Sequence, residues 1–183
     1  YLAVDQQLSF PIMSLKEHLK DRLLTKYEHL LTAEARQKSL LELISVVGAA
    51  FRQHNANDPH RLLAQLPLPV YVTTNTTNLL SDALKEQGRD PQVEYCRWNE
   101  DLLVEPSIYD DNPAYTPTVE QPLVYHLFGH LKEDRSLVLT EDDYFDYLIG
   151  SAITVQADLN FLWSYTPYPF EGLPQDGNPG NGC

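Results

Sequence analysis

Residues 70–88 constrain the fold most, because a strand pattern and a helix pattern follow each other there within a few residues. Val70-Tyr-Val-Thr-Thr74 is β-branched and aromatic, as strands are, and Asn75 ends the run. Residues 76–87 then carry leucine and alanine on one helical face, and Gly88 follows, where helices commonly end in a left-handed residue. The segment therefore predicts a strand, a tight turn and a helix.

Two further strand patterns come later in the chain, over residues 92–98 and 123–127, with a polar loop predicted over 99–121. The last of them precedes a helix that is predicted to begin at Thr140. Strands that are separated by helices favour parallel pairing, because each connection has to return to the same end of the sheet. We therefore expect a layered α/β fold.

Helical patterns occupy the region before the first strand. Their predicted starts are three capping signals, namely Ser14 with Glu17, Thr32, and Asp58 with Pro59. The apolar run over residues 40–51 is the most hydrophobic part of this region, and we expect it to be buried on most sides.

The charge of the chain excludes some functions. It has 26 acidic and 13 basic residues, which give a net charge of −13 and repel nucleic acids and anionic membrane surfaces. No run approaches the roughly 20 apolar residues of a membrane span, and no secretory leader is recognisable. We therefore expect a soluble, cytoplasmic protein. Cys96 and Cys183 are too few for a disulfide framework or a four-cysteine zinc site.

The candidate site residues follow the predicted strands, at the sheet edge where parallel α/β folds bind ligands. Asn75 follows one strand, where it can present its amide to a ligand or simply cap the next helix. His126 and His130 flank Gly129, and either can act as a base, bind a metal or be structural. Both reach one cavity only if the turn bends back. The acidic run Glu141-Asp-Asp143 is better explained by helix capping than by Mg²⁺ binding.

Two motifs resemble the sirtuin-like domains of bacterial defence and conflict-system proteins, over about residues 1–150. They are YVTTNTTNLL (71–80) and VYHLFGHLKEDRSLVLTEDDYFDYL (124–148). The resemblance implies a Rossmann-like parallel sheet that binds NAD⁺ and, in active members, cleavage of the bond between nicotinamide and ribose. It implies no metal site and, with two cysteines, no zinc ribbon of a protein deacetylase. It assigns NAD⁺ binding to Thr73, Thr74, Asn75, Thr77 and Gly129, and catalysis to Asn75, His126 and His130.

The sequence departs from this family pattern at three places. Phe128 occupies the position of the expected histidine base, so either His126 or His130 takes that role or the domain binds nucleotide without cleaving it. Thr77 replaces an aspartate and loses its negative charge. No glycine-rich phosphate-binding turn occurs in the first half of the chain, so we expect that turn and its strand to precede residue 1.

The resulting prediction divides the chain into a truncated sirtuin-like domain over residues 1–150 and a divergent tail over 151–183, largely disordered from about residue 166. The leading hypothesis is an NAD⁺-binding domain of an NAD⁺ glycohydrolase in antiphage defence. One alternative is an inactive module that senses NAD⁺ or ADP-ribose, and another is an inert interaction or assembly domain. A homo-oligomer or a multidomain parent protein is compatible with all three.

Overall fold

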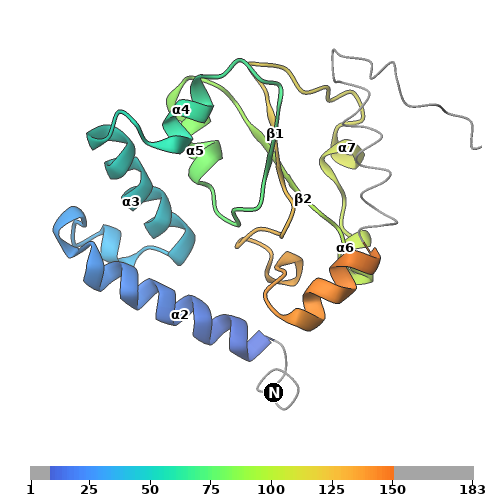
Figure 1. Cartoon of the computed structure of the whole chain (residues 1–183), viewed down its shortest axis with the longest axis horizontal. Helices are drawn as coiled ribbons and strands as arrows, with labels where there is room; N and C mark the ends of the chain where they lie inside the picture. Colours follow the sequence, from blue (N-terminus) through green and yellow to red (C-terminus); the bar gives the residue numbers. More distant parts are fainter. Residues whose placement is uncertain (1–8, 151–183) are drawn as a thin grey trace, which may run out of the picture.

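The computed structural model describes residues 9–150, and these form a parallel sheet with helices against both of its faces (Figure 1). The strands are β1 (Val70–Thr73), β2 (Gln92–Tyr95) and β3 (Leu123–His126). The α-helices are α2 (Ser9–Lys26), α3 (Leu40–His54), α4 (Pro59–Gln65), α5 (Leu79–Glu86), α6 (Glu100–Leu103), α7 (Ile108–Asp111) and a helix over residues 141–150. The 3₁₀ helices are η1 (Glu28–Leu30), η2 (Ala35–Gln37) and η3 (Asp134–Ser136).

The strand order is β1-β3-β2, so the last strand in the sequence lies between the other two. Val70 is opposite Leu123, and both Thr73 and Tyr95 are opposite His126. Both pairings are parallel, which confirms the predicted α/β fold with a parallel sheet flanked by helices. All three strands end at one edge, so the segments after β1 and β3 start beside each other.

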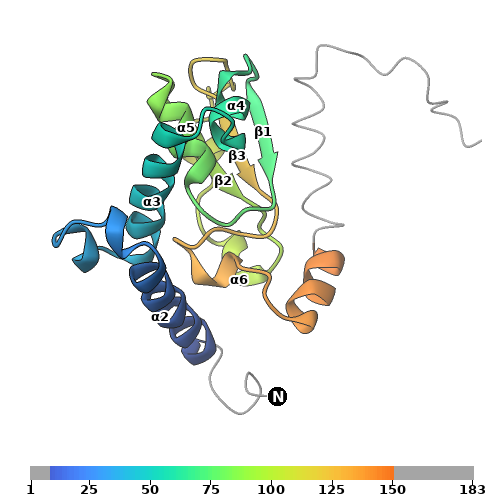
Figure 2. The same cartoon turned by 60° about the vertical axis from the view of Figure 1, so that its left-hand side comes forward.

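The central strand β3 is buried on both faces of the sheet. Leu123 and Tyr125 belong to one core cluster, and Val124 belongs to another. The first cluster also contains Cys96, Trp98, Leu102, Tyr115 and Tyr147, and the second contains Ala64, Tyr71, Leu80, Ala83 and Leu84. Figure 2 shows α3 and α5 on one side of the sheet and the helix over residues 141–150 on the other. Because side chains alternate along a strand, His126 shares the α5 side with Val124.

Helix α3 begins at a capping box that sequence reasoning missed. The backbone N–H of Ser39 donates to the Glu42 carboxylate at 2.9 Å, and the N–H of Glu42 donates back to the Ser39 hydroxyl at 3.4 Å. Leu43 and Val47 are buried against α2, whereas Phe51 is 44% exposed. Over residues 40–51 only Glu42 and Phe51 are exposed and the other ten residues are buried or half-buried, which agrees with the expectation of burial on most sides.

Two predicted helix starts also differ from the structure. Helix α2 begins at Ser9, so Ser14 lies inside the helix and cannot cap its first turn. The Thr32 hydroxyl does accept from the N–H of Ala35 at 3.2 Å, but only the single 3₁₀ turn η2 follows. The cap at Asp58 is confirmed, because its carboxylate accepts from the N–H of Arg61 at 3.0 Å.

The segment between β2 and β3 is more ordered than a polar loop. It contains α6, capped by Asn99, and α7, capped by Ser107. The strand predicted to reach residue 98 ends at Tyr95. Glu94, which is 6% exposed, fixes the segment that follows. Its carboxylate pairs with Arg97 at 3.1 Å and accepts from the N–H of Ile108 at 2.9 Å.

The helix over residues 141–150 begins where the sequence predicts. The Thr140 hydroxyl accepts from the N–H of Asp143 at 3.1 Å, and the Asp143 carboxylate accepts from the N–H of Thr140 at 2.8 Å. Asp143 is therefore a capping residue, as expected for an acidic first turn.

Some expectations lie outside residues 9–150. They concern the divergent tail predicted over residues 151–183 and its predicted disorder from about residue 166. Between residues 9 and 150, no helix combines the length and the apolar character that a membrane crossing requires.

Candidate functional site

The candidate site lies at the carboxyl edge of the sheet, where the turn after β1 meets the turn after β3. Two backbone hydrogen bonds hold these turns together: the N–H of Leu127 donates to Thr73 O at 2.8 Å, and that of Leu131 donates to Thr76 O at 2.8 Å. Asn75 and His130 lie on these turns, and His126 is the last residue of β3, directly before the second turn. The structure therefore brings together residues that are about fifty positions apart in the sequence.

His126 is fully buried at the end of β3. Its Nδ1 lies 2.5 Å from the backbone carbonyl oxygen of Asn75. A carbonyl can only accept, so Nδ1 carries the proton and Nε2 is left with a lone pair. That Nε2 is buried and has no hydrogen-bond partner among the described residues. A buried, unpaired acceptor is uncommon in proteins, and a catalytic role is one reason for which such an atom is retained.

His130 has the opposite arrangement of protons. The backbone N–H of Lys132 donates to its Nδ1 at 3.1 Å, so that nitrogen is an acceptor. Its Nε2 therefore carries the proton and donates to the Oδ1 of Asn78 at 2.7 Å. Both ring nitrogens of His130 are engaged, and the side chain is 3% exposed. Neither nitrogen is free to accept a proton from a substrate.

The turn between the two histidines does bend back, and Gly129 makes this possible. Gly129 has φ +81°, and a Cβ at this position would lie 2.0 Å from the carbonyl oxygen of Ser136. The Ser136 hydroxyl accepts from the backbone N–H of His130 at 2.8 Å, which fixes the return of the chain. As a result, the two imidazole rings have their centroids 4.7 Å apart.

Burial controls the charge of both histidines. It lowers the pKa of His126, although the hydrogen bond to Asn75 acts in the opposite direction. It also lowers the pKa of His130 to about 4, with smaller contributions from His126 and from Lys132. Both rings are therefore neutral near pH 7. A neutral His126 with a free Nε2 lone pair has the protonation state that a general base requires.

Four of the predicted NAD⁺-binding residues, Thr73, Thr74, Asn75 and Thr77, lie at the end of β1 and in the turn after it. The amide oxygen of Asn75 accepts from the N–H of Thr77 at 2.8 Å and from its hydroxyl at 2.6 Å. The hydroxyl of Thr73 accepts from the N–H of Asn75 at 3.0 Å, and Thr74 is exposed. The side chain of Asn75 shapes the turn, as an Asx turn does, rather than capping α5. Its NH₂ group donates to none of the described residues.

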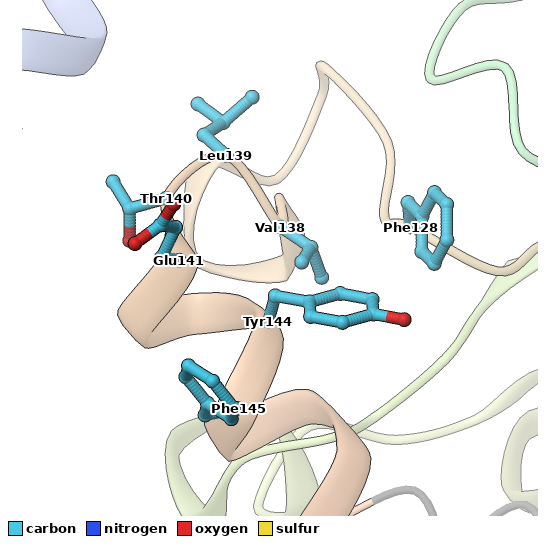
Figure 3. A pocket seen from close by; sticks show the side chains of 7 residues that line it. All are labelled: Phe128, Val138, Leu139, Thr140, Glu141, Tyr144 and Phe145. Atoms are coloured by element: carbon cyan, nitrogen blue, oxygen red, sulfur yellow. The ribbon is translucent and has the colours of Figure 1, made fainter.

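Phe128, at the expected base position, faces the opposite side of the sheet. Its ring packs edge-on against Tyr147 with the centroids 5.4 Å apart. It lines an open pocket of about 560 Å³ between the β3 turn and the helix over residues 141–150, shown in Figure 3. The other lining residues are Val138, Leu139, Thr140, Glu141, Tyr144 and Phe145. Phe128 therefore neither replaces nor blocks the histidine pair.

Sequence reasoning missed the residues that hold the histidines. Asn78 and Ser136 bond directly to His130, and Arg52 stabilises the start of α5 next to Asn78. Arg52 is buried at 2% exposure, pairs with Glu86 at 2.7 Å and donates to Leu79 O at 3.3 Å. An arginine within an apolar helix could have indicated that Arg52 has a buried partner. No sequence pattern around Asn78 or Ser136 predicts their contacts with His130.

Cys96 is buried in the core, and Cys183 lies outside residues 9–150. Within that range, no three or more histidine, cysteine, aspartate or glutamate side chains are grouped as metal ligands would be. The chemistry of the described site is that of neutral imidazole, amide and hydroxyl groups.

Comparison with known proteins places this site within a matched region. The sequence profile of the family described as "SIR2-like domain" matches residues 69–164, which include β1, β3 and both histidines. Three proteins named NAD(+) hydrolase ThsA are similar to the chain. The one from Enterococcus faecium is 31% identical over 91 residues, that from Cytobacillus dafuensis 30% over 88 residues, and that from Bacillus cereus (strain MSX-D12) 29% over 98 residues.

These similarities cover about half of this chain and a small part of each relative. The matched share is 50%, 48% and 54% of the chain, but only 16%, 15% and 18% of the respective relatives. The matched segment thus spans less than a fifth of the length of each of these curated relatives.

Proposed function

Because this chain belongs to the family of SIR2-like domains, we propose that it binds NAD⁺ and contributes the catalytic base to hydrolysis of the nicotinamide–ribose bond. The similarity to three NAD(+) hydrolases supports NAD⁺ as the substrate. The position of the histidines and of Asn75 at the carboxyl edge of a parallel sheet supports this edge as the binding site.

One observation carries the proposal, namely the unpaired Nε2 of His126. Its tautomer is fixed by the Asn75 carbonyl, and burial lowers the pKa of His126 so that the ring is neutral at physiological pH. The same contact places the backbone of Asn75 directly against the base. The amide NH₂ of Asn75 is then available to donate to a ribose hydroxyl or to the nicotinamide carboxamide.

In this reaction, His126 receives the proton that the attacking water has to lose. The bond between nicotinamide and the ribose carbon breaks, the electron pair leaves with nicotinamide, and the ribose carbon becomes cationic. Water attacks that carbon as its proton passes to Nε2 of His126. The imidazolium then returns the proton to solvent. The products are nicotinamide, ADP-ribose and one proton, so neither a metal nor a redox step is needed.

His130 is assigned a positioning role rather than the role of base. Both of its nitrogens are engaged, and its pKa of about 4 makes it a weaker proton acceptor. Its ring packs against the ring of His126 and thereby fixes the orientation of the His126 imidazole in the site. This assignment chooses between the two histidines, which the sequence alone left as rivals.

Two observations favour a second function, binding of NAD⁺ or ADP-ribose without turnover. The amide oxygen of Asn75 is already occupied by Thr77, and the Nε2 of His126 is buried. A substrate must therefore displace surrounding atoms to reach the base. If the protein does not open in this way, the site senses the nucleotide and leaves it intact.

The test measures nicotinamide release and ligand binding in parallel. The 183-residue chain, and the full gene product if it is longer, are incubated with NAD⁺, and nicotinamide is quantified by chromatography. Calorimetric titrations with NAD⁺ and ADP-ribose are run on the same samples. Release that is lost in His126→Ala supports hydrolysis. Binding without release supports the sensing function, and absence of both contradicts the proposal and favours an interaction domain.

We propose further that this activity serves defence against phages in the bacterial cytoplasm, within an assembly of several copies. The resemblance to defence-system domains and the similarity to the three bacterial hydrolases support this setting. Phage challenge of bacteria that carry the gene, with His126→Ala as the control, tests it. Equal survival of cells with the two versions contradicts a defence role that depends on NAD⁺ cleavage.

A further inference from the structure

A second pocket, of about 400 Å³, lies between α2, the start of α3 and the turn that follows His130. Its lining includes Lys16, Lys20, Lys132, Glu17, Leu40 and Leu131. Figure 1 shows α2 running past the end of the sheet where the turns after β1 and β3 emerge. The pocket is therefore on the ligand-binding side of the parallel sheet.

Lysines are concentrated at this pocket. The chain has a net charge of −13 and only six lysines, and three of them line the pocket, with one glutamate, Glu17, among the other lining residues. Lys20 and Lys132 form no ion pair within residues 9–150. Glu42, near Lys20, is already held by Ser39, and its pKa is lowered first by these hydrogen bonds and then by Lys38 and Lys20. Two cationic groups thus remain available to an anion.

Lys16 connects the pocket to the histidine site. Its Nζ pairs with Asp134 and donates to Leu131 O at 3.1 Å, which attaches α2 to the turn after His130. In the same turn, the backbone N–H of Lys132 donates to Nδ1 of His130 at 3.1 Å. The lysine pocket and the histidine pair therefore share one short turn, in which Leu131 and Lys132 line the pocket and His130 belongs to the pair.

We propose that this pocket is an anion subsite that holds the phosphate groups of the dinucleotide while its nicotinamide ribose reaches His126. Lys20 and Lys132 supply the charge, Lys16 holds the turn, and Leu40 and Leu131 offer an apolar surface to uncharged parts of the ligand. A lysine ammonium group is a compact cation that attracts phosphate oxygens. The inference rests on the proposed function for the identity of the ligand.

The experiment measures binding of inorganic pyrophosphate and of ADP-ribose to the 183-residue chain by calorimetry at low and high salt. The variants are Lys20→Glu, Lys132→Glu and Lys20→Arg. Lys26→Glu is the matched control, since it makes the same change of charge on the same helix, and its Nζ lies over the Tyr27 ring at 5.1 Å rather than in the pocket. Thermal unfolding of each variant shows whether it is folded.

We expect Lys20→Glu and Lys132→Glu each to raise the Kd for both ligands by about tenfold or more. Lys26→Glu and Lys20→Arg should bind both ligands with nearly the affinity of the unchanged protein. Added salt should weaken binding to the unchanged protein and reduce this difference. The inference is overturned if the unchanged protein does not bind pyrophosphate, if Lys26→Glu has the same effect, or if only pyrophosphate and not ADP-ribose depends on the lysines.

These outcomes separate the subsite from the proposed catalysis. If the protein releases nicotinamide but the Lys20 and Lys132 variants bind the ligands as the unchanged protein does, the subsite is refuted and the hydrolysis proposal stands. Lysine-dependent binding of ADP-ribose without release supports the subsite and counts against hydrolysis. In an active protein, Lys132→Glu should raise the KM for NAD⁺ more than it lowers kcat, because the contact is made in both ground and transition states.

Discussion

The imidazole ring of His130 lies edge-on against that of His126, with the centroids 4.7 Å apart and the ring planes at 75°. The pair joins the turn after β1 to the turn after β3, because His126 bonds to Asn75 and His130 bonds to Asn78. The two rings differ in one respect that matters for chemistry. His126 has a nitrogen without a partner among residues 9–150, whereas both nitrogens of His130 are used.

Replacement of the two histidines should therefore have unequal effects on turnover. We expect His126→Ala to lower kcat for nicotinamide release by about 10²–10⁴, the usual contribution of a general base. His130→Gln keeps an N–H that can donate to Asn78 and should lower kcat by less than about tenfold. Steady-state kinetics of both variants, with circular dichroism as the folding control, tests this order. Equal losses would mean that His130 is more than a positioning residue.

The buried His130 should also make the protein less stable in mild acid. Its pKa is lowered to about 4 in the folded state, mainly by burial, against an ordinary value near 6.5. Between these two values the unfolded chain binds a proton at this position and the folded protein does not. The free energy of unfolding therefore falls as the pH is lowered through this window, by up to about 3 kcal/mol from this group.

Urea unfolding at several pH values between about 4 and 7 measures this contribution, with His130→Gln as the comparison. The acidic side chains titrate in both proteins, so the difference between their two pH profiles isolates His130. The variant should lose less stability toward the acid end of this range than the unchanged protein. Parallel profiles would show that His130 is protonated in the folded state at the same pH as in the unfolded chain.

Local sequence patterns predicted the elements of the sheet but not the way in which they combine. The strand at Val70, the αL glycine at Gly88 and the cap at Thr140 were correct, because each depends on neighbouring residues. The missed α7 has the same kind of signal in Ser107 and Asp110, which form its capping box. The role of Asn78, by contrast, could not be predicted from neighbouring residues, since its partner His130 is 52 positions away.

The identity of the base was also beyond the sequence. Resemblance placed it at Phe128, and only the three-dimensional path of the turn shows that this ring points to the other face of the sheet. The return of the chain depends on the contact of Gly129 with the Ser136 carbonyl, which is a tertiary contact. The histidines could be proposed as site residues from the sequence, whereas the proposed division into base and positioning residue rests on their hydrogen bonds.

The two glycines with positive φ allow the steric requirement at Gly129 to be measured. Gly88 has φ +77° and open space where an alanine methyl group would lie, whereas a methyl group at Gly129 would overlap the Ser136 carbonyl. Gly88→Ala should cost about 1–2 kcal/mol from the left-handed backbone alone. Gly129→Ala should cost at least about 2 kcal/mol more, because the turn has to move. Urea unfolding of both variants tests this difference, and equal costs would contradict a tight turn.

A histidine at the expected family position should not act as a second base. Phe128 lies against Tyr147 on the face away from His126, so Phe128→His places its imidazole in the apolar pocket of Figure 3. We expect a loss of roughly 1–3 kcal/mol in the free energy of unfolding, because an aromatic contact is replaced by a polar ring. Turnover should not rise. Recovery of activity in the double variant His126→Ala with Phe128→His would contradict this orientation of the ring.

Asn78 offers the sharpest test of how the histidine pair is held. Asn78→Ala removes the acceptor for the buried Nε2–H of His130, and an unpaired buried donor costs about 1–3 kcal/mol. Asn57→Ala, at an exposed position, is the control and should have little effect. Asn78→Asp keeps an acceptor oxygen but adds a negative charge, which favours the protonated form of His130 and raises its pKa from about 4.

NMR titration of the imidazole Cε1–H signals distinguishes these effects, since it reports the pKa of each histidine separately. In Asn78→Asp, His130 should titrate at a higher pH than in the unchanged protein. A protonated His130 next to His126 should also lower the pKa of His126, because the two rings are in contact. The acid limb of the pH–rate profile should move with the pKa of His126, the proposed base. If the His130 signal shifts and the rate profile does not change, the two rings titrate independently.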